Sequence, residues 1–229
     1  MKKLIYGIIT LFLITFVQPI QAQETYVGII GGLNFADLEI TLKNGMSNDF
    51  DVGAKTKVGI GALFGISFNK YLSLQLEPKY IGKGGLVTQT STPDITMKSS
   101  QLDIPLILKA GIGEKIRPYI FAGMFISFVL DASMEAEVSG ILLKGDLTQV
   151  LEQTEYGALF GAGINVPVWI GSAFVEGRYA LGLTNLNLGG NVYLKYNNMS
   201  VAGIQLDPGD KIKTKGISIM LGYIFPLSL

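Results

Sequence analysis

Bulky apolar side chains alternate with small or polar ones along several segments of this chain. From Val58 to Phe68, one alternate set reads Val, Ile, Ala, Phe, Ile, Phe and the other reads Gly, Gly, Leu, Gly, Ser. The segment from Ile217 to Phe225 repeats this pattern with Ile, Ile, Leu, Tyr and Phe on one face. Because successive side chains of a strand point to opposite faces, both segments predict strands with one apolar and one nearly empty face.

Charged residues of the predicted strands fall on the narrow face, opposite the bulky apolar set. A soluble barrel places its apolar side chains inside, so the chain has the reverse arrangement. An Arg or Lys that faces lipid near the bilayer centre costs roughly 2–4 kcal/mol, and we therefore expect the charges to line the interior. The proposed interior ionic network comprises Glu77, Lys79, Asp103, Lys109, Arg117, Glu176 and Arg178.

This pattern predicts an all-β fold: a single antiparallel up-and-down transmembrane β-barrel of about eight strands, its lumen filled by polar and small side chains. An eight-stranded barrel is only wide enough for its own side chains to fill. We therefore interpret the network as structural, with opposite charges paired inside the barrel. A path for protons or ions is the alternative interpretation.

The chain has 229 residues and no composition shift that divides it, which predicts one domain after a leader. Lys2 and Lys3 precede the apolar run Leu4–Val17, and the sequence reaches Ala22 soon after. This is the layout of a secretory signal peptide, and the run is shorter than the roughly 20 residues of a membrane-spanning helix. We predict a signal peptide over residues 1–22, a barrel domain over 23–229, and export to the bacterial outer membrane.

The predicted strands are connected by links of alternating length. Short links fall at 69–71, 112–116 and 167–172, and long ones at 36–56, 82–100, 130–155 and 184–213. Outer-membrane barrels have short periplasmic turns and long external loops, so both termini are expected in the periplasm. The predicted strands are 26–35, 57–68, 72–81, 101–111, 117–129, 156–166, 173–183 and 214–225.

Two regions leave alternatives open. The segment Ile116–Leu130 is apolar on both faces, and we favour the phase that places Ile120, Met124 and Ile126 outward. The predicted loop Ala132–Thr154 carries Leu and Val at helical spacing. It is either an amphipathic element that caps the barrel or meets a partner, or a loop that packs on itself.

The sequence offers few residues for catalysis. It contains no histidine and no cysteine, which excludes imidazole bases, histidine metal sites, thiolate sites and disulfides. Lys and Arg together number 18, as do Asp and Glu, so no excess of positive charge points to nucleic acid. We predict a protein that is not an enzyme and holds neither cofactor nor metal.

Several short stretches resemble the PorT-like outer-membrane β-barrel proteins of Bacteroidetes. The resemblance covers nearly the whole mature chain and rests on residues 31–35, 75–80, 102–109, 117–119, 176–179, 182–185 and 221–225. It implies a small barrel that the outer-membrane assembly machinery inserts among lipid and lipopolysaccharide. The founding PorT protein is associated with type IX secretion, which makes secretion-system proteins candidate partners.

The leading hypothesis is a non-catalytic integral outer-membrane barrel that acts through external loops or by stabilising the envelope. Three alternatives stay open: an accessory component of type IX protein secretion, a narrow solute channel, and a soluble secreted ligand-binding barrel. Loss of protein export on deletion would support the first alternative. Single-channel conductance would support the second, and a monodisperse chain without detergent would support the third.

Overall fold

The computed structural model describes residues 24–41, 51–89, 92–138, 140–197 and 199–227. The predicted signal peptide lies outside these ranges. No helix in the described ranges has the length and apolarity needed to cross a membrane. The strands are β1 (Glu24–Thr41), β2 (Asp51–Ser67), β3 (Leu72–Leu76), β4 (Lys79–Gln89), β5 (Thr92–Gly111), β6 (Arg117–Val138), β7 (Ile141–Asp146), β8 (Thr154–Val168), β9 (Gly171–Gly182), β10 (Gly190–Tyr196), β11 (Met199–Leu206) and β12 (Lys211–Leu227).

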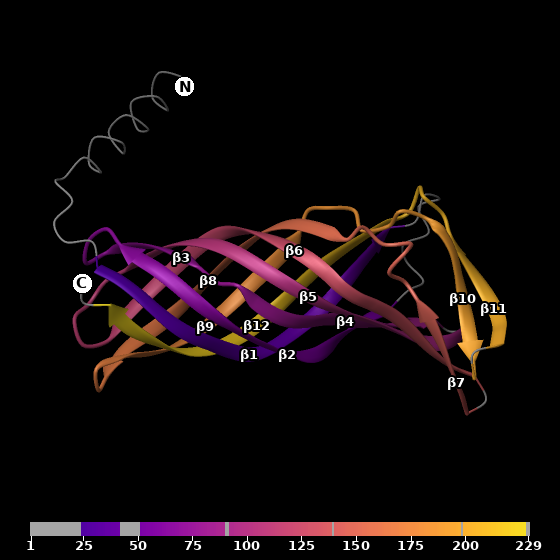
Figure 1. Ribbon diagram of the computed structural model, residues 1–229, viewed down its shortest axis with the longest axis horizontal. Coiled ribbons are helices and arrows are strands. Elements are labelled where there is room, and N and C mark those ends of the chain that lie inside the picture. Colours follow the sequence, from indigo (N-terminus) through magenta and orange to yellow (C-terminus); the bar gives the residue numbers. More distant parts are fainter. Residues whose placement is uncertain (1–23, 42–50, 90–91, 139, 198, 228–229) are drawn as a thin grey trace, which may run out of the picture.

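An antiparallel sheet closes into a ring with eight strand positions (Figure 1). Around the ring, β1 pairs with β2, β2 pairs with β3 and β4, and both of these pair with β5. The strands β6, β8, β9 and β12 follow, and β12 pairs with β1 from Leu227 opposite Thr25 to Lys211 opposite Thr41. The predicted antiparallel barrel is confirmed. The strand count differs, because the described chain has twelve strands rather than about eight.

One ring position is divided between β3 and β4 at Glu77 and Pro78. Proline has no N–H to donate, so it interrupts a ladder of hydrogen bonds. The carbonyl of Pro78 still accepts from the N–H of Ala62 (3.0 Å), and the N–H of Glu77 donates to the carbonyl of Pro105 (3.1 Å). The ring therefore stays bonded on both sides of the break.

The two ends of the barrel differ. At one end lie the start of β1, the end of β12 and the short turns at 68–71, 112–116 and 169–170, close to the predicted short links (Figure 1). At the other end, the regions predicted as long loops are largely strand. They contain the extended ends of the ring strands together with β7, β10 and β11, which lie outside the ring.

The loop predictions were wrong because each predicted strand was ended at the last residue of its lipid-facing apolar set. On β12 the outward positions change from Ile217 to Lys215 and Lys213, while Ile212 and Thr214 on the inner face stay buried. The hydrogen-bonded ladder with β1 continues through this change. A loss of apolar alternation therefore marks the end of the apolar band rather than the end of the strand.

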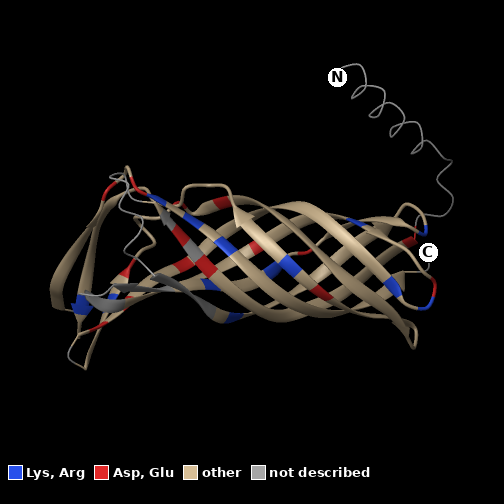
Figure 2. Cartoon of the chain, turned by 180° about the vertical axis from the view of Figure 1, so that it is seen from behind, with Lys and Arg blue, Asp and Glu red and all other residues tan. Residues whose placement is uncertain are grey.

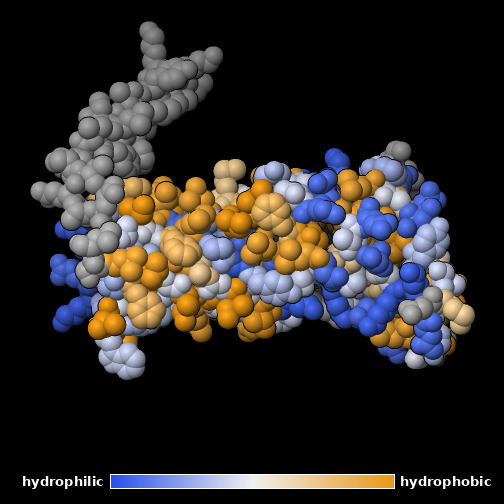
Figure 3. Space-filling model, in the orientation of Figure 1, coloured by the Kyte–Doolittle hydropathy of each residue, from blue (hydrophilic) through white to orange (hydrophobic). Residues whose placement is uncertain are grey.

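The outer wall of the ring carries a band of exposed apolar side chains, seen towards the end with the termini in Figure 3. Ile60 is 66% exposed and Met124 is 67% exposed, whereas Phe121 and Phe125 on the same strand as Met124 are buried. The favoured phase of β6 is thereby confirmed. The opposite end, around β7, β10 and β11, has a more hydrophilic surface.

Large apolar rings also fill the lumen, which corrects the expectation of only polar and small side chains. Five inward aromatic residues each lie directly opposite a glycine of the neighbouring strand. An alanine Cβ in place of Gly161 would meet the Phe121 ring at 2.5 Å, so the missing side chain provides the space for the ring. The pairs are Tyr26 with Gly65, Tyr119 with Gly163, Phe121 with Gly161, Phe125 with Gly157, and Phe174 with Gly222.

A separate apolar core lies at the end opposite the termini, in the extension formed by β7, β10, β11 and the segments around them. After β7 the chain makes a turn in which the N–H groups of Val150 and Leu151 both donate to the carbonyl of Leu147. These three side chains are buried with Val192 and Leu194 of β10. The helical spacing noted in the sequence therefore belongs to a single turn that packs against neighbouring strands.

Candidate functional site

Arg178 of β9 lies at the centre of a buried ionic network in the lumen. Its Nη1 lies 2.5 Å from Oε2 of Glu77, and its Nη2 donates to Oε1 of the same carboxylate at 2.9 Å. Its Nε donates to Oε2 of Glu176 at 2.7 Å, and Nη2 also bonds this oxygen. One guanidinium thus holds two carboxylates in a fork geometry, which is among the stronger forms of ion pairing.

A second cation completes this cluster. Lys109 of β5 places its Nζ 2.6 Å from Oε1 of Glu176, and the hydroxyl of Tyr119 donates to the same oxygen at 2.7 Å. The ammonium also lies over the rings of Tyr119, Phe121 and Phe174, at 4.9, 5.7 and 5.2 Å from their centroids. Carboxylate, hydroxyl and aromatic faces together replace the water that the buried ammonium loses.

A second ionic cluster is centred on Lys83 of β4. Its Nζ lies 3.0 Å from Oε2 of Glu155 and 3.5 Å from Oδ1 of Asp103. The hydroxyl of Ser127 donates to Asp103 at 2.6 Å, and the hydroxyl of Thr214 donates to Glu155. These residues come from β4, β5, β6, β8 and β12, so the cluster ties together strands from several sides of the ring.

Buried charges of opposite sign are equal in number in the described part of the chain. Four acids and four bases are buried there, and the fourth base, Lys79, lies opposite Asp103 in the β4–β5 register. Figure 2 shows acidic and basic positions close together along the barrel. Because a buried charge is costly unless paired, this balance favours a lumen in which the groups neutralise one another.

A model of the family described as "Outer membrane protein beta-barrel domain" matches residues 21–187, which is most of the chain. The protein belongs to this outer-membrane β-barrel family. Membership places it in the bacterial outer membrane, in agreement with the closed ring and its exposed apolar band. The narrower resemblance to PorT-like proteins of Bacteroidetes stays a prediction.

Solved structures of outer-membrane proteins match the chain at low sequence identity. OprG from Pseudomonas aeruginosa is 14% identical, with 90% of this chain and 97% of that chain covered and a TM-score of 0.49. Neisserial surface protein A is 12% identical, with coverages of 88% and 98% and a TM-score of 0.44. E. coli outer membrane protein W is 15% identical, with coverages of 90% and 99% and a TM-score of 0.38. No curated protein matches the chain.

In this outer-membrane barrel, six residues of the proposed network are buried in the lumen and the seventh lies apart. The buried ones divide between the two clusters, with Lys79 beside Asp103 in register. Arg117 begins β6 at the end with the termini, where its guanidinium donates to the carbonyl of Lys70. Within the described residues no ion pair joins Arg117 to the other six, because its strand position places it nearer the mouth of the barrel.

Sequence reasoning missed several residues of the two clusters and their surroundings, among them Lys83, Glu155 and the hydroxyl groups of Tyr119, Ser127 and Thr214. Lys83 and Glu155 fell in regions predicted as loops, and Tyr26 and Tyr119 were counted only as strand residues. A signal was present for Lys83, because it follows Glu77 and Lys79 at even spacing and therefore shares their face. Tyr26 contributes through Gln75, whose side-chain oxygen accepts from the Tyr26 hydroxyl at 3.0 Å while its nitrogen donates to Glu77.

The chemistry available to the network is limited by its own pairing. Each carboxylate of the two clusters already accepts hydrogen bonds from a cation or a hydroxyl. The described residues contain no group of three or more Asp or Glu side chains arranged to hold a metal ion. The arrangement is therefore that of a cross-link between strands.

Proposed function

We propose that this outer-membrane protein is a non-catalytic, non-conducting barrel that works by binding through the β-structured extension at the end opposite its termini. The observation that carries the proposal is the filled lumen. The lumen holds two ionic clusters and inward aromatic rings that pack against their cations, and the extension adds an apolar core of its own. In barrels of this class, the end opposite the short turns faces the exterior of the cell.

The exposed surface of the extension supports a binding role. Tyr193, Met199 and Val201 are 55%, 69% and 61% exposed, although Val192 and Leu194 beside Tyr193 are buried in the apolar core. Exposed apolar side chains on a folded, water-facing element are typical of interaction surfaces. The core beneath them holds the hairpin of β10 and β11 in place, aided by Asn187, which donates to the carbonyls of Asp207 and Asp210.

Conductance tests the closed lumen. Purified protein is first checked by gel mobility, because a folded membrane barrel migrates differently before and after boiling. The heat-sensitive form is then placed in a planar lipid bilayer beside a porin as positive control. We expect no single-channel steps under conditions in which the porin conducts. Regular steps from the purified barrel would overturn the closed lumen and favour the solute channel.

Complementation tests whether the extension carries the function. A deletion strain is assayed for protein export and for sensitivity to an antibiotic that an intact outer membrane excludes. We expect the native protein to restore the strain, whereas Tyr193→Ser with Met199→Ser and Val201→Ser does not. Asn191→Ser with Gln205→Ser, two exposed polar positions of the same hairpin, is the matched control. Full restoration by the triple variant would contradict a role for the extension.

A further inference from the structure

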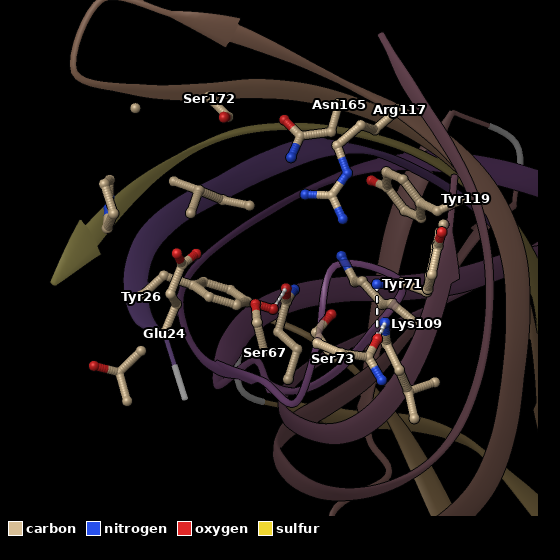
Figure 4. A pocket seen from close by; sticks show the side chains of 18 of the residues that line it. Glu24, Tyr26, Ser67, Tyr71, Ser73, Lys109, Arg117, Tyr119, Asn165 and Ser172 are labelled. Atoms are coloured by element: carbon tan, nitrogen blue, oxygen red, sulfur yellow. Dashed lines mark hydrogen bonds between the residues drawn. The ribbon is translucent and has the colours of Figure 1, made fainter. Parts of the chain in front are cut away.

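A cavity of about 340 Å³, lined by both polar and apolar side chains, opens at the end of the barrel that carries the termini. Arg117, Tyr119 and Asn165 line one side of it, and Tyr26, Ser67 and Ser73 lie across the open space (Figure 4). The cavity volume lies within the range of small-molecule binding sites. Its floor is the Lys109 and Tyr119 end of the buried ionic network.

Arg117 adds positive charge to this cavity. The buried acids and bases below it are equal in number, and Glu176 at the floor already bonds Arg178, Lys109 and Tyr119. A guanidinium has five N–H donors, and in the described part of the chain that of Arg117 donates to one protein acceptor, the carbonyl of Lys70. Glu24 also lines the cavity, but it is exposed and forms no ion pair with Arg117 in the described structure.

Neighbouring polar groups favour a ligand that carries hydrogen-bond donors, such as hydroxyl or amide groups, beside its acidic group. Asn165 is the cross-strand partner of Arg117, and its Oδ1 is buried without a hydrogen-bond partner in the described structure. The hydroxyls of Ser67 and Ser73 line the opposite wall. A guanidinium matches the two oxygens of a carboxylate, and hydroxyl and amide groups around it match the polar remainder of a small organic acid.

We propose that this cavity binds a small organic carboxylate that enters from the periplasmic end, with Arg117 as the anchoring residue. The site lies at the opposite end from the extension and does not depend on the proposed binding function there. Arg117 holds the carboxylate, and Asn165 with the serine hydroxyls contacts the polar groups of the ligand. The buried network beneath closes the cavity, so the ligand binds without passing through the barrel.

The only tryptophan of the chain, Trp169, is 96% exposed at the rim of the same cavity and provides a spectroscopic readout. Folded protein in detergent is titrated with glucuronate and with N-acetylalanine, and their neutral counterparts glucose and N-acetylalaninamide serve as ligand controls. Tryptophan fluorescence follows the titration, and calorimetry measures the same equilibrium independently. We expect saturable binding of at least one carboxylate and none of the matching neutral compound.

Variants locate the site. Arg117→Gln is expected to weaken carboxylate binding by about tenfold or more. Arg117→Lys should weaken it less, because a lysine keeps the positive charge but cannot form two parallel hydrogen bonds to a carboxylate. Lys115→Gln, an exposed lysine in the adjacent turn that does not line the cavity, should bind as the native protein does. Heat-dependent gel mobility verifies that each variant is folded. Absence of saturable binding by both acids, equal binding of the neutral compounds, or native affinity in Arg117→Gln would each overturn the proposal.

Discussion

The guanidinium of Arg178 bonds the carboxylate of Glu77 across the lumen, with Nη1 2.5 Å from Oε2, although the two residues are 101 positions apart in the chain. Arg178 belongs to β9, and Glu77 stands at the break between β3 and β4. These strands are not neighbours in the ring. The pair therefore connects opposite parts of the barrel wall across the lumen.

Removing Arg178 should destabilise the barrel strongly. Arg178→Ala leaves two buried carboxylates with a missing partner, and breaking such a pair costs about 3–5 kcal/mol. The free energy of unfolding is measured by urea titration of the protein in lipid vesicles. Arg117→Ala, which removes an arginine outside the buried network, is the matched control and should change stability by less than about 1 kcal/mol. Equal effects of the two substitutions would contradict a stabilising role of the Arg178 ion pairs.

Lys83 and Glu155 should show a favourable coupling. Lys83→Met leaves the buried carboxylate of Glu155 with the Thr214 hydroxyl as its hydrogen-bond donor, and Glu155→Gln leaves Lys83 with the Asp103 carboxylate and the Phe125 ring. The double variant removes both charges, so its loss of stability should be smaller than the sum of the two single losses by about 0.5–3 kcal/mol. The measurement is a double-mutant cycle of unfolding free energies. Additive losses would show that the ion pair makes no net contribution.

Two glycines on neighbouring strands should respond differently to alanine. A Cβ at Gly161 would meet the carbonyl oxygen of Gly177 and the ring of Phe121, whereas a Cβ at Gly177 would meet nothing within 4 Å. Gly161→Ala should cost about 1–3 kcal/mol through overpacking. Gly177→Ala should change stability by less than about 0.5 kcal/mol. A barrel that tolerates both substitutions equally would refute the packing of Phe121 over Gly161.

Trp169 should lie at the membrane interface. It is 96% exposed in the β8–β9 turn beside Ile170, which is 79% exposed. Its φ of 53° is an unfavourable backbone conformation for a bulky side chain. Tryptophan is enriched at membrane–water interfaces, so its emission in vesicles should shift to shorter wavelength and be quenched by lipids with brominated chains. Emission typical of water with efficient iodide quenching would place the turn away from the bilayer.

The sequence by itself determined the ring strands and the face to which each side chain points. Periodicity of two residues depends only on the local geometry of a strand, so Glu77, Lys109 and Arg178 could be placed inside without knowledge of their partners. The same periodicity determined that Ile120 and Met124 face outward, and the structure confirms their exposure.

Only the tertiary structure decided which of these charges meet. The partners of Arg178 depend on the register of β3, β5 and β9 around a closed ring, and periodicity contains no information about register between distant strands. For the same reason the sequence placed Arg117 with the buried charges, whereas its strand position puts it at the mouth. The extension was predicted as loops because its strands are short and their outward faces mix apolar with polar side chains, so they lack the regular alternation by which the ring strands were recognised.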